Sequence, residues 1–426
     1  MAKLFSDRNR PVHMGRFPKE ILKRSAHMPD LDGLAAWPDL SFQRPAGTAS
    51  LVPAMAEFQA MMDAVRDGPQ NQAPSEIPED RLERSRHLKS FAYFNDISMV
   101  GIAPLGQADR LAAARRNPQI DRLSHALQTR QTKTLAAGID VIMADLRESM
   151  AAKPQPMDHH TYALVFLVAY RRDPRPGEIG CDWVQDAQAE RAAVLGTETA
   201  TVLANYIRIL GYSARAHSAT TCDVDLARLA VKAGLAQVAG DEITHPWLGQ
   251  RFGLAAVTTD MALAPDLPLA ADQPQSALMG LDWTLGRHGG ASRRSHDPYA
   301  RREYAQGAHP FETLKRVETP TTYIDEPNVA RVPKRTDMFA RAQFGDMGPA
   351  LQKGATAGHY ARKAAPSSAQ RRLLGAFVLL QDGEPAAHAQ QIAPEVAADN
   401  IKGASYFLGI DATGVSRCPE WSWYSH

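Results

Sequence analysis

The thiol groups of this chain are few and lie far apart. Cys181, Cys222 and Cys418 are its three cysteines, and no two of them form a CxxC pair. A [4Fe–4S] cluster is bound by four cysteine thiolates, and a four-cysteine zinc site needs as many. The sequence therefore cannot build either site alone, and it is not a disulfide-dense secreted scaffold. We expect the cysteines to be reduced thiols in a reducing compartment.

The histidines do not complete a metal site by their spacing. His159 and His160 are adjacent, and adjacent side chains on an extended segment point to opposite faces, so they would chelate one ion poorly. We expect the stretch that begins at Asp158 to be a polar loop in front of a strand. Glu242 and His245 are close in sequence, but no HExxH motif or second histidine completes a zinc site.

Nucleophilic catalysis and nucleotide binding have little support in the sequence. His217 and Cys222 could form a dyad, but the residues between them are turn-like and no third member is near. The sequence has no GxGxxG, P-loop or GxSxG motif. We therefore expect no metal site, no dinucleotide site and no serine hydrolase site in this chain.

The composition is that of a soluble globular protein. Hydrophobic residues make up 44% and charged residues 22%, and the formal net charge of +1 gives no electrostatic case for binding nucleic acid or an anionic membrane. The N-terminus becomes charged at Asp7 and Arg8 before an apolar segment could form, so it does not resemble a secretory signal. The longest apolar run, residues 162–170, is too short to span a bilayer as a helix. We expect a cytoplasmic protein.

Apolar periodicity predicts alternating helices and strands, mainly between residues 82 and 268. Helices are predicted over 55–65, 188–210 and 225–233, with Gly211 and Gly234 just after the last two, and an amphipathic helix is marked by apolar residues between 139 and 150. Strands are predicted over 97–102, 163–170 and 254–259. These elements indicate an α+β unit in which helices cover a sheet.

The chain divides into four parts by composition. Residues 1–81 are predicted to form an extended N-terminal arm, 82–268 the compact α/β unit, and 269–370 a long irregular connector, because Pro, Gly and Arg are frequent there and periodicity is weak. Residues 371–426 return to apolar patterns, including the run 371–380.

An internal repeat links the second part to the fourth. Residues 88–103 (LKSFAYFNDISMVGIA) align without a gap with residues 401–416 (IKGASYFLGIDATGVS), at a separation of 401 minus 88, or 313 residues. Each copy predicts a helix that carries a Tyr-Phe pair, a short link, and a strand that passes through a glycine. The identical positions include Lys89 and Lys402, Tyr93-Phe94 and Tyr406-Phe407, Ile97 and Ile410, and Gly101 and Gly414.

A separation of this length implies two domains of one kind and not a solenoid. The second copy starts near residue 385, and few residues follow the repeat. We expect a truncated chain or one half of a split system, with an exposed, half-built domain that lowers solubility or needs a partner.

Several segments together resemble the reductive dehalogenases and the related epoxyqueuosine reductases. The segments, in chain order, are 8–23 (RNRPVHMGRFPKEILK), 205–215 (NYIRILGYSAR), 226–235 (LARLAVKAGL), 251–265 (RFGLAAVTTDMALAP) and 340–349 (ARAQFGDMGP). Three of them are similar to the family patterns YIRxLGYxA, LAVxAGLG and RLAAVTTDLPL. The first and last are similar to segments of the longer, non-exported proteobacterial members.

The resemblance implies a nitroreductase-like module of α/β/α type that binds cobalamin without its lower base. Two [4Fe–4S] clusters feed electrons to the cobalt, which removes halogen from an organohalide, and the carbon is then protonated. A redox donor protein would be a further partner. Longer members carry a degenerate copy of the cobalamin domain in front of the working copy, which is similar to the repeat found here.

The departures from the family pattern lie at the cofactor ligands. The family places a CxxCxxCxxxCP run after the VTTD strand, whereas residues 260–417 of this chain contain no cysteine. The glycine-rich turn that should follow Gly234-Leu235 reads Ala-Gln-Val-Ala. We therefore expect a first module without clusters, with an altered cofactor pocket and no activity in isolation.

The segment 419–426 (PEWSWYSH) resembles the family segment that carries the tyrosine donating a proton to the substrate carbon, and the matching residue is Tyr424. A phenol whose ordinary pKa is about 10 can act in this way if a neighbouring cation lowers that value. The alternative is that Trp421, Trp423 and Tyr424 alternate along an amphipathic strand and serve packing.

Three hypotheses follow. The chain is the non-catalytic front half of a reductive dehalogenase, or a stand-alone module that binds cobalamin or another flat cofactor, or a cofactor-free interaction protein descended from such an enzyme.

Overall fold

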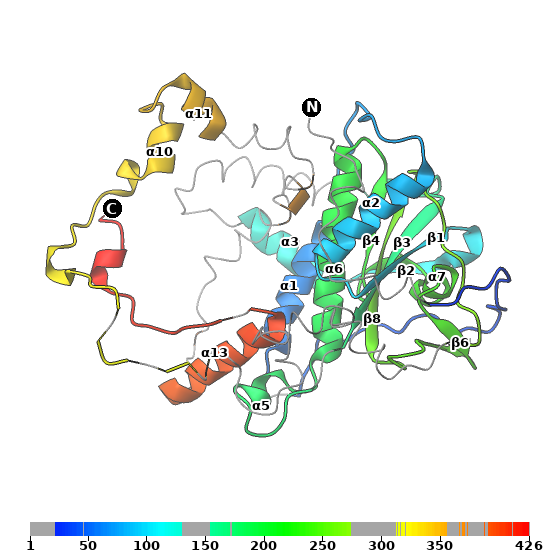
Figure 1. Cartoon of the computed structure of the whole chain (residues 1–426), viewed down its shortest axis with the longest axis horizontal. Helices are drawn as coiled ribbons and strands as arrows, with labels where there is room; N and C mark the ends of the chain where they lie inside the picture. Colours follow the sequence, from blue (N-terminus) through cyan, green and yellow to red (C-terminus); the bar gives the residue numbers. More distant parts are fainter. Residues whose placement is uncertain are drawn as a thin grey trace.

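The computed structural model describes residues 22–129 except 46, 154–273 except 171 and 172, 312–355 except 313, 316 and 320, and 391–425 except 411, with residues 366, 369, 370, 373 and 387. The helix expected within residues 139–150 and nearly all of the run 371–380 lie outside these residues. Figure 1 shows a sheet with helices on both sides, α13 beside α5, and α10 and α11 further from the sheet.

The central sheet has four antiparallel strands in the order β1-β3-β8-β4. The strands are β1 (Met99–Pro104), β3 (Tyr162–Ala169), β8 (Phe252–Thr259) and β4 (Ala214–His217). β3 and β8 pair along their whole lengths, and all eight residues of β8 are buried. A strand that is buried on both faces reads as a continuous apolar run, which is why β3 and β8 were predictable from the sequence.

One face of the sheet is covered by three helices. They are α1 (Val52–Ala64), α2 (Arg81–Phe94) and the long α6 (Gln188–Ile209), and they share one apolar cluster with inward-facing residues of β1, β3 and β8. Figure 1 shows α6 running along the sheet with α1 and α2 beside it.

The other face is covered by α7 (Leu226–Lys232) and by residues near the β6–β7 hairpin. The side chain of Asp225 accepts hydrogen bonds from the amides of Ala227 and Arg228, which caps the N-terminus of α7. The sheet is therefore the middle of three layers, as the α/β/α prediction requires.

The contact between α6 and β8 is close because two glycines face the opposing element. A Cβ added at Gly196 of α6 would lie 3.1 Å from the Cβ of Ala255, and one added at Gly253 of β8 would lie 2.9 Å from that of Ala192. Small residues on both sides bring the helix backbone unusually near the strand, so α6 is fixed against the sheet.

The remaining elements are short. They are η3 (Gln107–Asp109), β2 (Arg110–Arg115) paired with β5 (Cys222–Val224), α3 (Gln119–Thr129), α5 (Cys181–Val184), the hairpin β6 (Gln237–Ala239) and β7 (Glu242–Thr244), η5 (Glu326–Asn328), η6 (Lys334–Thr336), α10 (Met338–Gln343), α11 (Pro349–Ala355), α13 (Pro394–Leu408) and η9 (Glu420–Ser422). Among the helices of the described ranges, none has both the length and the apolar character of a membrane span.

Two of the expected regions contain helices, the first of them close to the helix predicted over 55–65. The N-terminal arm includes α1, and Val52, Met61 and Met62 of this helix are fully buried in the main apolar cluster. The connector contains the short helices α10 and α11, both of them too brief to show a clear period in the sequence.

The helical part of the internal repeat is confirmed. α13 begins at the position equivalent to the start of α2 and ends one residue later than α2 does. Both helices are followed by a left-handed residue at equivalent positions, Asp96 at φ 61° and Gly409 at φ 103°. In the first copy the next amide, that of Ile97, donates to the carbonyl oxygen of Ala92 at 3.2 Å. In the second copy the amide of Ile410 donates to the equivalent carbonyl oxygen, that of Ser405, at 2.9 Å. A glycine at the left-handed position avoids the steric cost that Asp96 carries.

The strand expected in the second copy is not formed. Residues 412–417 correspond to β1 but pair with no strand among the described residues. The amphipathic strand expected around Trp421, Trp423 and Tyr424 is likewise wrong, because this segment forms the single turn η9 followed by irregular backbone. A lone strand leaves its amide and carbonyl groups without a ladder, so an extended apolar pattern alone does not make one.

α13 packs against the first module through two glycines. A Cβ at Gly403 would lie 2.5 Å from the carbonyl oxygen of Ile179 and 2.6 Å from the Cα of Gly180, whose own φ is 65°. The guanidinium of Arg191 donates to the carbonyl oxygen of Phe407 at 2.6 Å and lies over its ring. Backbone contact of this kind tolerates no side chain at either glycine.

We expect Gly403→Val to release α13, because the added side chain would meet backbone atoms that cannot move aside. The free energy of unfolding should fall by about 1–3 kcal/mol, and amides of residues 394–408 should lose protection in hydrogen exchange. Gly414→Ala is the control, because a Cβ there meets nothing within 4 Å. Equal protection of α13 in both variants would contradict the packing described.

Candidate functional site

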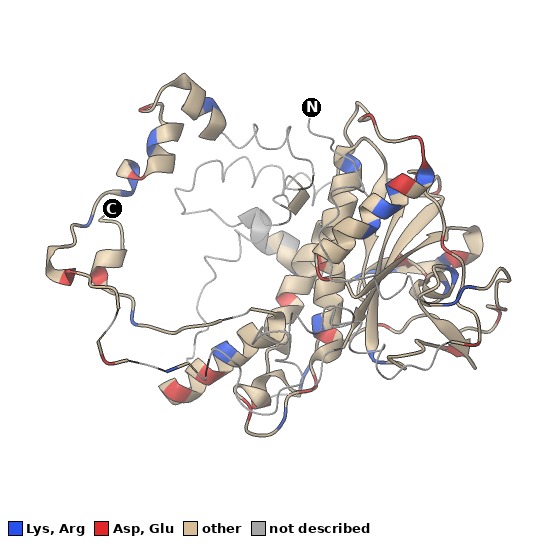
Figure 2. Ribbon diagram, in the orientation of Figure 1, with Lys and Arg blue, Asp and Glu red and all other residues tan. Residues whose placement is uncertain are grey.

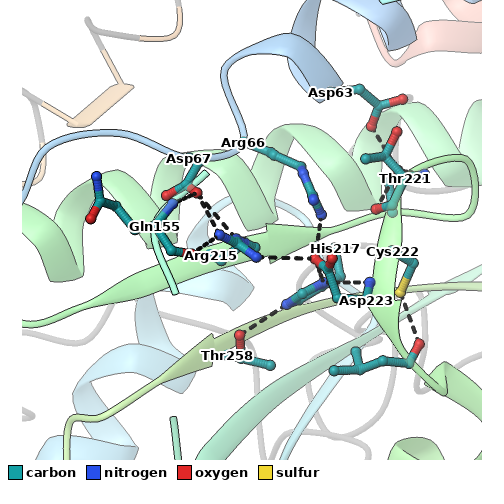
Figure 3. Close-up of polar contacts among 12 residues, drawn as sticks. Asp63, Arg66, Asp67, Gln155, Arg215, His217, Thr221, Cys222, Asp223 and Thr258 are labelled. Atoms are coloured by element: carbon teal, nitrogen blue, oxygen red, sulfur yellow. Dashed lines mark hydrogen bonds and ion pairs between the residues drawn. The ribbon is translucent and has the colours of Figure 1, made fainter. Parts of the chain in front are cut away.

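A buried polar network lies where the C-terminal end of α1 meets β4, β5 and β8. Figure 3 shows its main members pointing toward one another from these separate elements. Its two histidines, His160 and His217, are 3% and 1% exposed. Buried imidazoles need hydrogen-bond partners, and each of these has two.

The two imidazoles share one hydroxyl group. Thr258 Oγ1 on β8 lies 2.9 Å from His217 Nε2 and 2.8 Å from His160 Nδ1, and His160 Nε2 lies 2.8 Å from Ser213 Oγ. The amide of Asp223 donates to His217 Nδ1 at 3.3 Å, so the ring proton of His217 is on Nε2 and is donated to Thr258. His160 is hydrogen-bonded through both ring nitrogens, to Thr258 and to Ser213. One hydroxyl group of β8 therefore links the two imidazoles.

Two arginine–aspartate pairs border the histidines. Arg66 donates to Asp223 at 2.8 Å, and Arg215 donates to Asp67 at 2.8 Å while also lying 3.5 Å from Asp223. Burial acts to raise the pKa of Asp223, but the surrounding charges, with those of Arg66 and Arg215 among them, outweigh it and the pKa is lowered. Each charge in this group is therefore compensated by a neighbour.

Asp63 anchors a second part of the network one turn earlier on α1. Its carboxylate accepts from Asn117 at 3.0 Å, Ser218 at 2.7 Å and Thr220 at 2.5 Å. Its pKa is raised, because burial outweighs the hydrogen bonds that act to lower it. Asp63 thus ties α1 to the turn between β4 and β5 and to the start of α3.

The network holds its histidines neutral. Burial lowers the pKa of His160 to about 3 and that of His217 well below its ordinary value. Cys222 is not a partner of His217, because its thiol donates to the carbonyl oxygen of Val224 at 2.9 Å and burial raises its pKa to about 12. The arrangement joins strands and helices, and it has no thiolate or exposed base with which to attack a substrate.

The other sequence candidates are dispersed. His159 is exposed beside the buried His160, at the loop predicted before β3. His245 is buried in the turn after β7, where its Nδ1 accepts from the amide of Trp247 at 3.1 Å and its pKa is lowered to about 3 by burial. Among the described residues, no three His, Cys, Asp or Glu side chains come together as metal ligands.

Tyr424 lies on the exposed C-terminal segment. Its hydroxyl donates to Asp337 Oδ2 at 3.3 Å, and the negative charge of Asp337 raises the pKa of the phenol. Arg331 binds the carbonyl oxygens of Trp423 and Tyr424 at 3.2 Å and 2.8 Å and does not bind the phenol. Whether Tyr424 donates a proton stays a prediction, and in this arrangement its neighbour acts against it.

The turn after α7 is filled by the chain itself. At this position the family pattern has a glycine-rich turn. Here the space in front of Gly234, at φ 63°, is occupied by the Arg24 guanidinium and the carbonyl oxygen of Leu267. Arg24 also donates to the carbonyl oxygen of Gly234 at 2.6 Å. The backbone of this turn is therefore covered by Arg24 and Leu267 on the side that a Cβ at Gly234 would face.

Charge does not gather on the face of the molecule seen in Figure 2. Basic and acidic residues are interspersed along α2 and along α13, and none of the described elements in this view carries a long run of one sign.

Comparison with known proteins identifies relatives by structure. No protein-family model matches the chain, and a search of curated proteins gave no match. The catabolic reductive dehalogenase NpRdhA, as an N-terminally tagged protein, is 31% identical with a TM-score of 0.72, and the match covers 99% of this chain and 54% of that one. A complex of NpRdhA with 3-bromo-4-hydroxybenzoic acid matches with 30% identity, a TM-score of 0.71 and the same coverage of both chains.

A further solved structure of a reductive dehalogenase, described as suggesting a mechanism for B12-dependent dehalogenation, matches with 30% identity and a TM-score of 0.71. The match covers 99% of this chain and 54% of that one. This chain therefore spans about half the length of the solved structures that it matches. The resemblance seen in the ordered sequence segments is confirmed.

We expect Thr258→Val to destabilise the chain strongly, because the shape is kept while one hydroxyl that serves two imidazoles is lost. Each unpaired buried nitrogen costs about 1–3 kcal/mol, so the free energy of unfolding should fall by about 2–6 kcal/mol in a denaturant titration. Thr244→Val, on the half-buried hairpin strand β7, is the matched control and should change it by less than about 1 kcal/mol. A similar loss in both would contradict the shared role of Thr258.

Acid should unfold the chain through its buried histidines. His160, His217 and His245 are neutral when folded and protonate near pH 6.5 when unfolded, so stability is constant above that pH and falls below it. Below pH 6.5 each histidine lowers the free energy of unfolding by about 1.4 kcal/mol for each unit that the pH falls, or about 4 kcal/mol for the three together.

The measurement is the free energy of unfolding between pH 7 and pH 4. His245→Asn keeps an acceptor for the amide of Trp247 and should reduce the slope by about one third. His27→Asn, at an exposed position, should leave it unchanged. A flat profile down to pH 4 would show that these histidines are not held neutral.

Proposed function

From the premise that this chain belongs to a reductive dehalogenase-like family, we propose that its module of residues 52–269 is a non-catalytic support within a dehalogenase. The module is a folded platform, and the removal of halogen takes place on another domain. The closed turn after α7 is the observation that carries this proposal, since Arg24 and Leu267 fill the space in front of Gly234.

The cysteine count supports the same conclusion. Four thiolates are needed for each [4Fe–4S] cluster, and this chain has three cysteines, of which Cys181 and Cys222 are buried. Electrons from a redox donor protein would thus have no cluster path through this module. No step of the proposed role passes through cobalamin bound to it, and the B12-dependent dehalogenation belongs to the solved relative.

The layer order supports a nitroreductase-like origin for the module. An antiparallel sheet with α6 on one face and α7 on the other is what a cobalamin domain that lost its ligands would retain. The free thiols are consistent with a cytoplasmic, reducing location. In a complete enzyme the substrate would be an organohalide, for which 3-bromo-4-hydroxybenzoic acid, bound by a relative, is the natural test compound.

A second candidate, the interaction protein, is favoured by the exposed apolar residues of the C-terminal part. Ile401, Ile410 and Val415 are each about half exposed. Single apolar residues on a surface are ordinary, but several in one short segment indicate a contact surface. The two roles are compatible, since a support must bind what it supports.

The purified full chain should release no bromide from 3-bromo-4-hydroxybenzoic acid. The assay supplies hydroxocobalamin, iron, sulfide and a chemical reductant without oxygen, and NpRdhA is assayed in parallel as the positive control. After gel filtration the chain should carry no corrinoid absorbance in the visible region and no bound iron. Bromide release above background would refute the supporting role, and bound corrinoid without release would favour a cofactor-binding module instead.

A further inference from the structure

A group of oxygen-bearing side chains is enclosed between α1, α6 and the turn that joins β4 to β5. Gln59 and Asp63 belong to α1, Thr197 belongs to α6, and Ser218 and Thr220 belong to the turn. The first four of these side chains are buried, with at most 2% of each residue exposed. The group therefore lies inside the protein, and its one charged member is the carboxylate of Asp63.

The side-chain amide of Gln59 is hydrogen-bonded at only one of its two ends. Its nitrogen lies 3.1 Å from Asp63 Oδ1, 3.0 Å from Thr197 Oγ1 and 3.2 Å from Thr220 Oγ1. Its oxygen is buried and has no hydrogen-bond partner among the described residues. Nearly all buried polar atoms in folded proteins have a partner, so an orphaned oxygen in a polar group indicates a bound water molecule or ion.

Thr201 of α6 carries a second orphaned oxygen. Its hydroxyl is fully buried and has no partner in the part of the chain that the structure describes. The amide of Gln59 contacts α6 one turn before Thr201, and the guanidinium of Arg208, near the end of α6, reaches the carbonyl oxygen of Arg66 at 3.4 Å. α1 and α6 therefore run in the same direction, which places Thr201 level with Asp63, one turn beyond Gln59.

The carboxylate of Asp63 is not matched by a positive charge within the buried network. Arg66 pairs with Asp223 at 2.8 Å. Arg215 pairs with Asp67 at the same distance, and both histidines of the network are neutral. Two arginines and three aspartates leave one negative charge over. A buried charge is costly unless a counter-charge or a proton offsets it.

The neighbours of Asp63 favour its charged form. The amide nitrogens of Gln59 and Asn117 donate one hydrogen bond to each carboxylate oxygen, at 3.1 Å and 3.0 Å. The hydroxyl oxygens of Ser218 and Thr220 lie 2.7 Å and 2.5 Å from the same two oxygens. A carboxylate that accepts several hydrogen bonds is stabilised as the anion. The balancing charge is then expected from a cation beside it.

We propose that a monovalent cation, Na⁺ or K⁺, binds between α1 and α6, with Gln59 Oε1, Thr201 Oγ1 and the Asp63 carboxylate among its ligands. Hard cations prefer oxygen ligands, which are what this group offers. A single positive charge balances the network, whereas Ca²⁺ or Mg²⁺ would leave one positive charge over. The bound ion joins α1, which precedes the compact unit in the sequence, to the helix that lies against the sheet.

The test compares the full chain in NaCl, KCl and choline chloride, each at about 0.1 M so that screening is equal. Choline is too large for an enclosed site, so the melting temperature should be at least about 3 °C higher in NaCl or KCl. The salt that gives the larger rise identifies the preferred ion. Equal melting temperatures in the three salts would overturn the proposal and would assign the orphaned oxygens to water and the carboxylate to its protonated form.

Thr201→Val and Thr199→Val are the matched pair of variants. Both hydroxyls are buried in α6 and neither has a partner among the described residues, but Thr199 is two positions away and so lies about 200° around the helix. Loss of a ligand in Thr201→Val should raise the apparent Kd of the ion at least about tenfold, measured from the rise in melting temperature with salt concentration. Thr199→Val should keep the unmodified Kd, and the same Kd in both variants would contradict the site.

Two further measurements separate ion binding from a structural role of the same residues. In choline chloride, Thr201→Val should melt no lower than the unmodified chain, because without the ion its hydroxyl is an unpaired buried group. A much lower melting temperature there would assign Thr201 to packing alone. Asp63→Asn keeps the shape and removes the charge, so it should lose the difference between the salts. A folded Asp63→Asn variant that retains this difference would refute the proposed ligand set.

Discussion

The close approach of α6 to β8 governs much of this structure. Gly196 and Gly253 let the helix backbone lie near the strand, and the Ala255 and Ala192 methyl groups fill the gap. α6 therefore lies directly against the sheet, and α1 and α2 cover the rest of the same face. With α7 on the opposite face, the sheet is enclosed by the chain itself.

Much of the fold was predictable because its elements carry local signals. The run from residue 163 to residue 170 is apolar throughout, as a strand buried on both faces must be, and the long helix of residues 188–209 is followed by Gly211 at φ 93°. The family was predictable from ordered short segments. In both cases the information lies within a few neighbouring residues.

The polar network was not predictable, because its members are brought together by strand pairing. Thr258 reaches His217 only because β4 and β8 pair in one register, with Arg215 opposite Thr258. His160 comes from a segment about one hundred residues distant in sequence from its partner Thr258. The strand predicted for the aromatic residues near the C-terminus was wrong for the opposite reason. They alternate as a strand would, but no neighbouring strand among the described residues satisfies their backbone.

The three thiols divide into two kinds with a practical consequence. Cys181 and Cys222 are buried, and burial raises the pKa of each, so both react slowly with alkylating reagents near neutral pH. Cys418 is exposed and follows directly on residues 412–417. The chain therefore carries a natural attachment point for a fluorophore or spin label at the end of its C-terminal segment, and such a probe would report on that segment without any engineered cysteine.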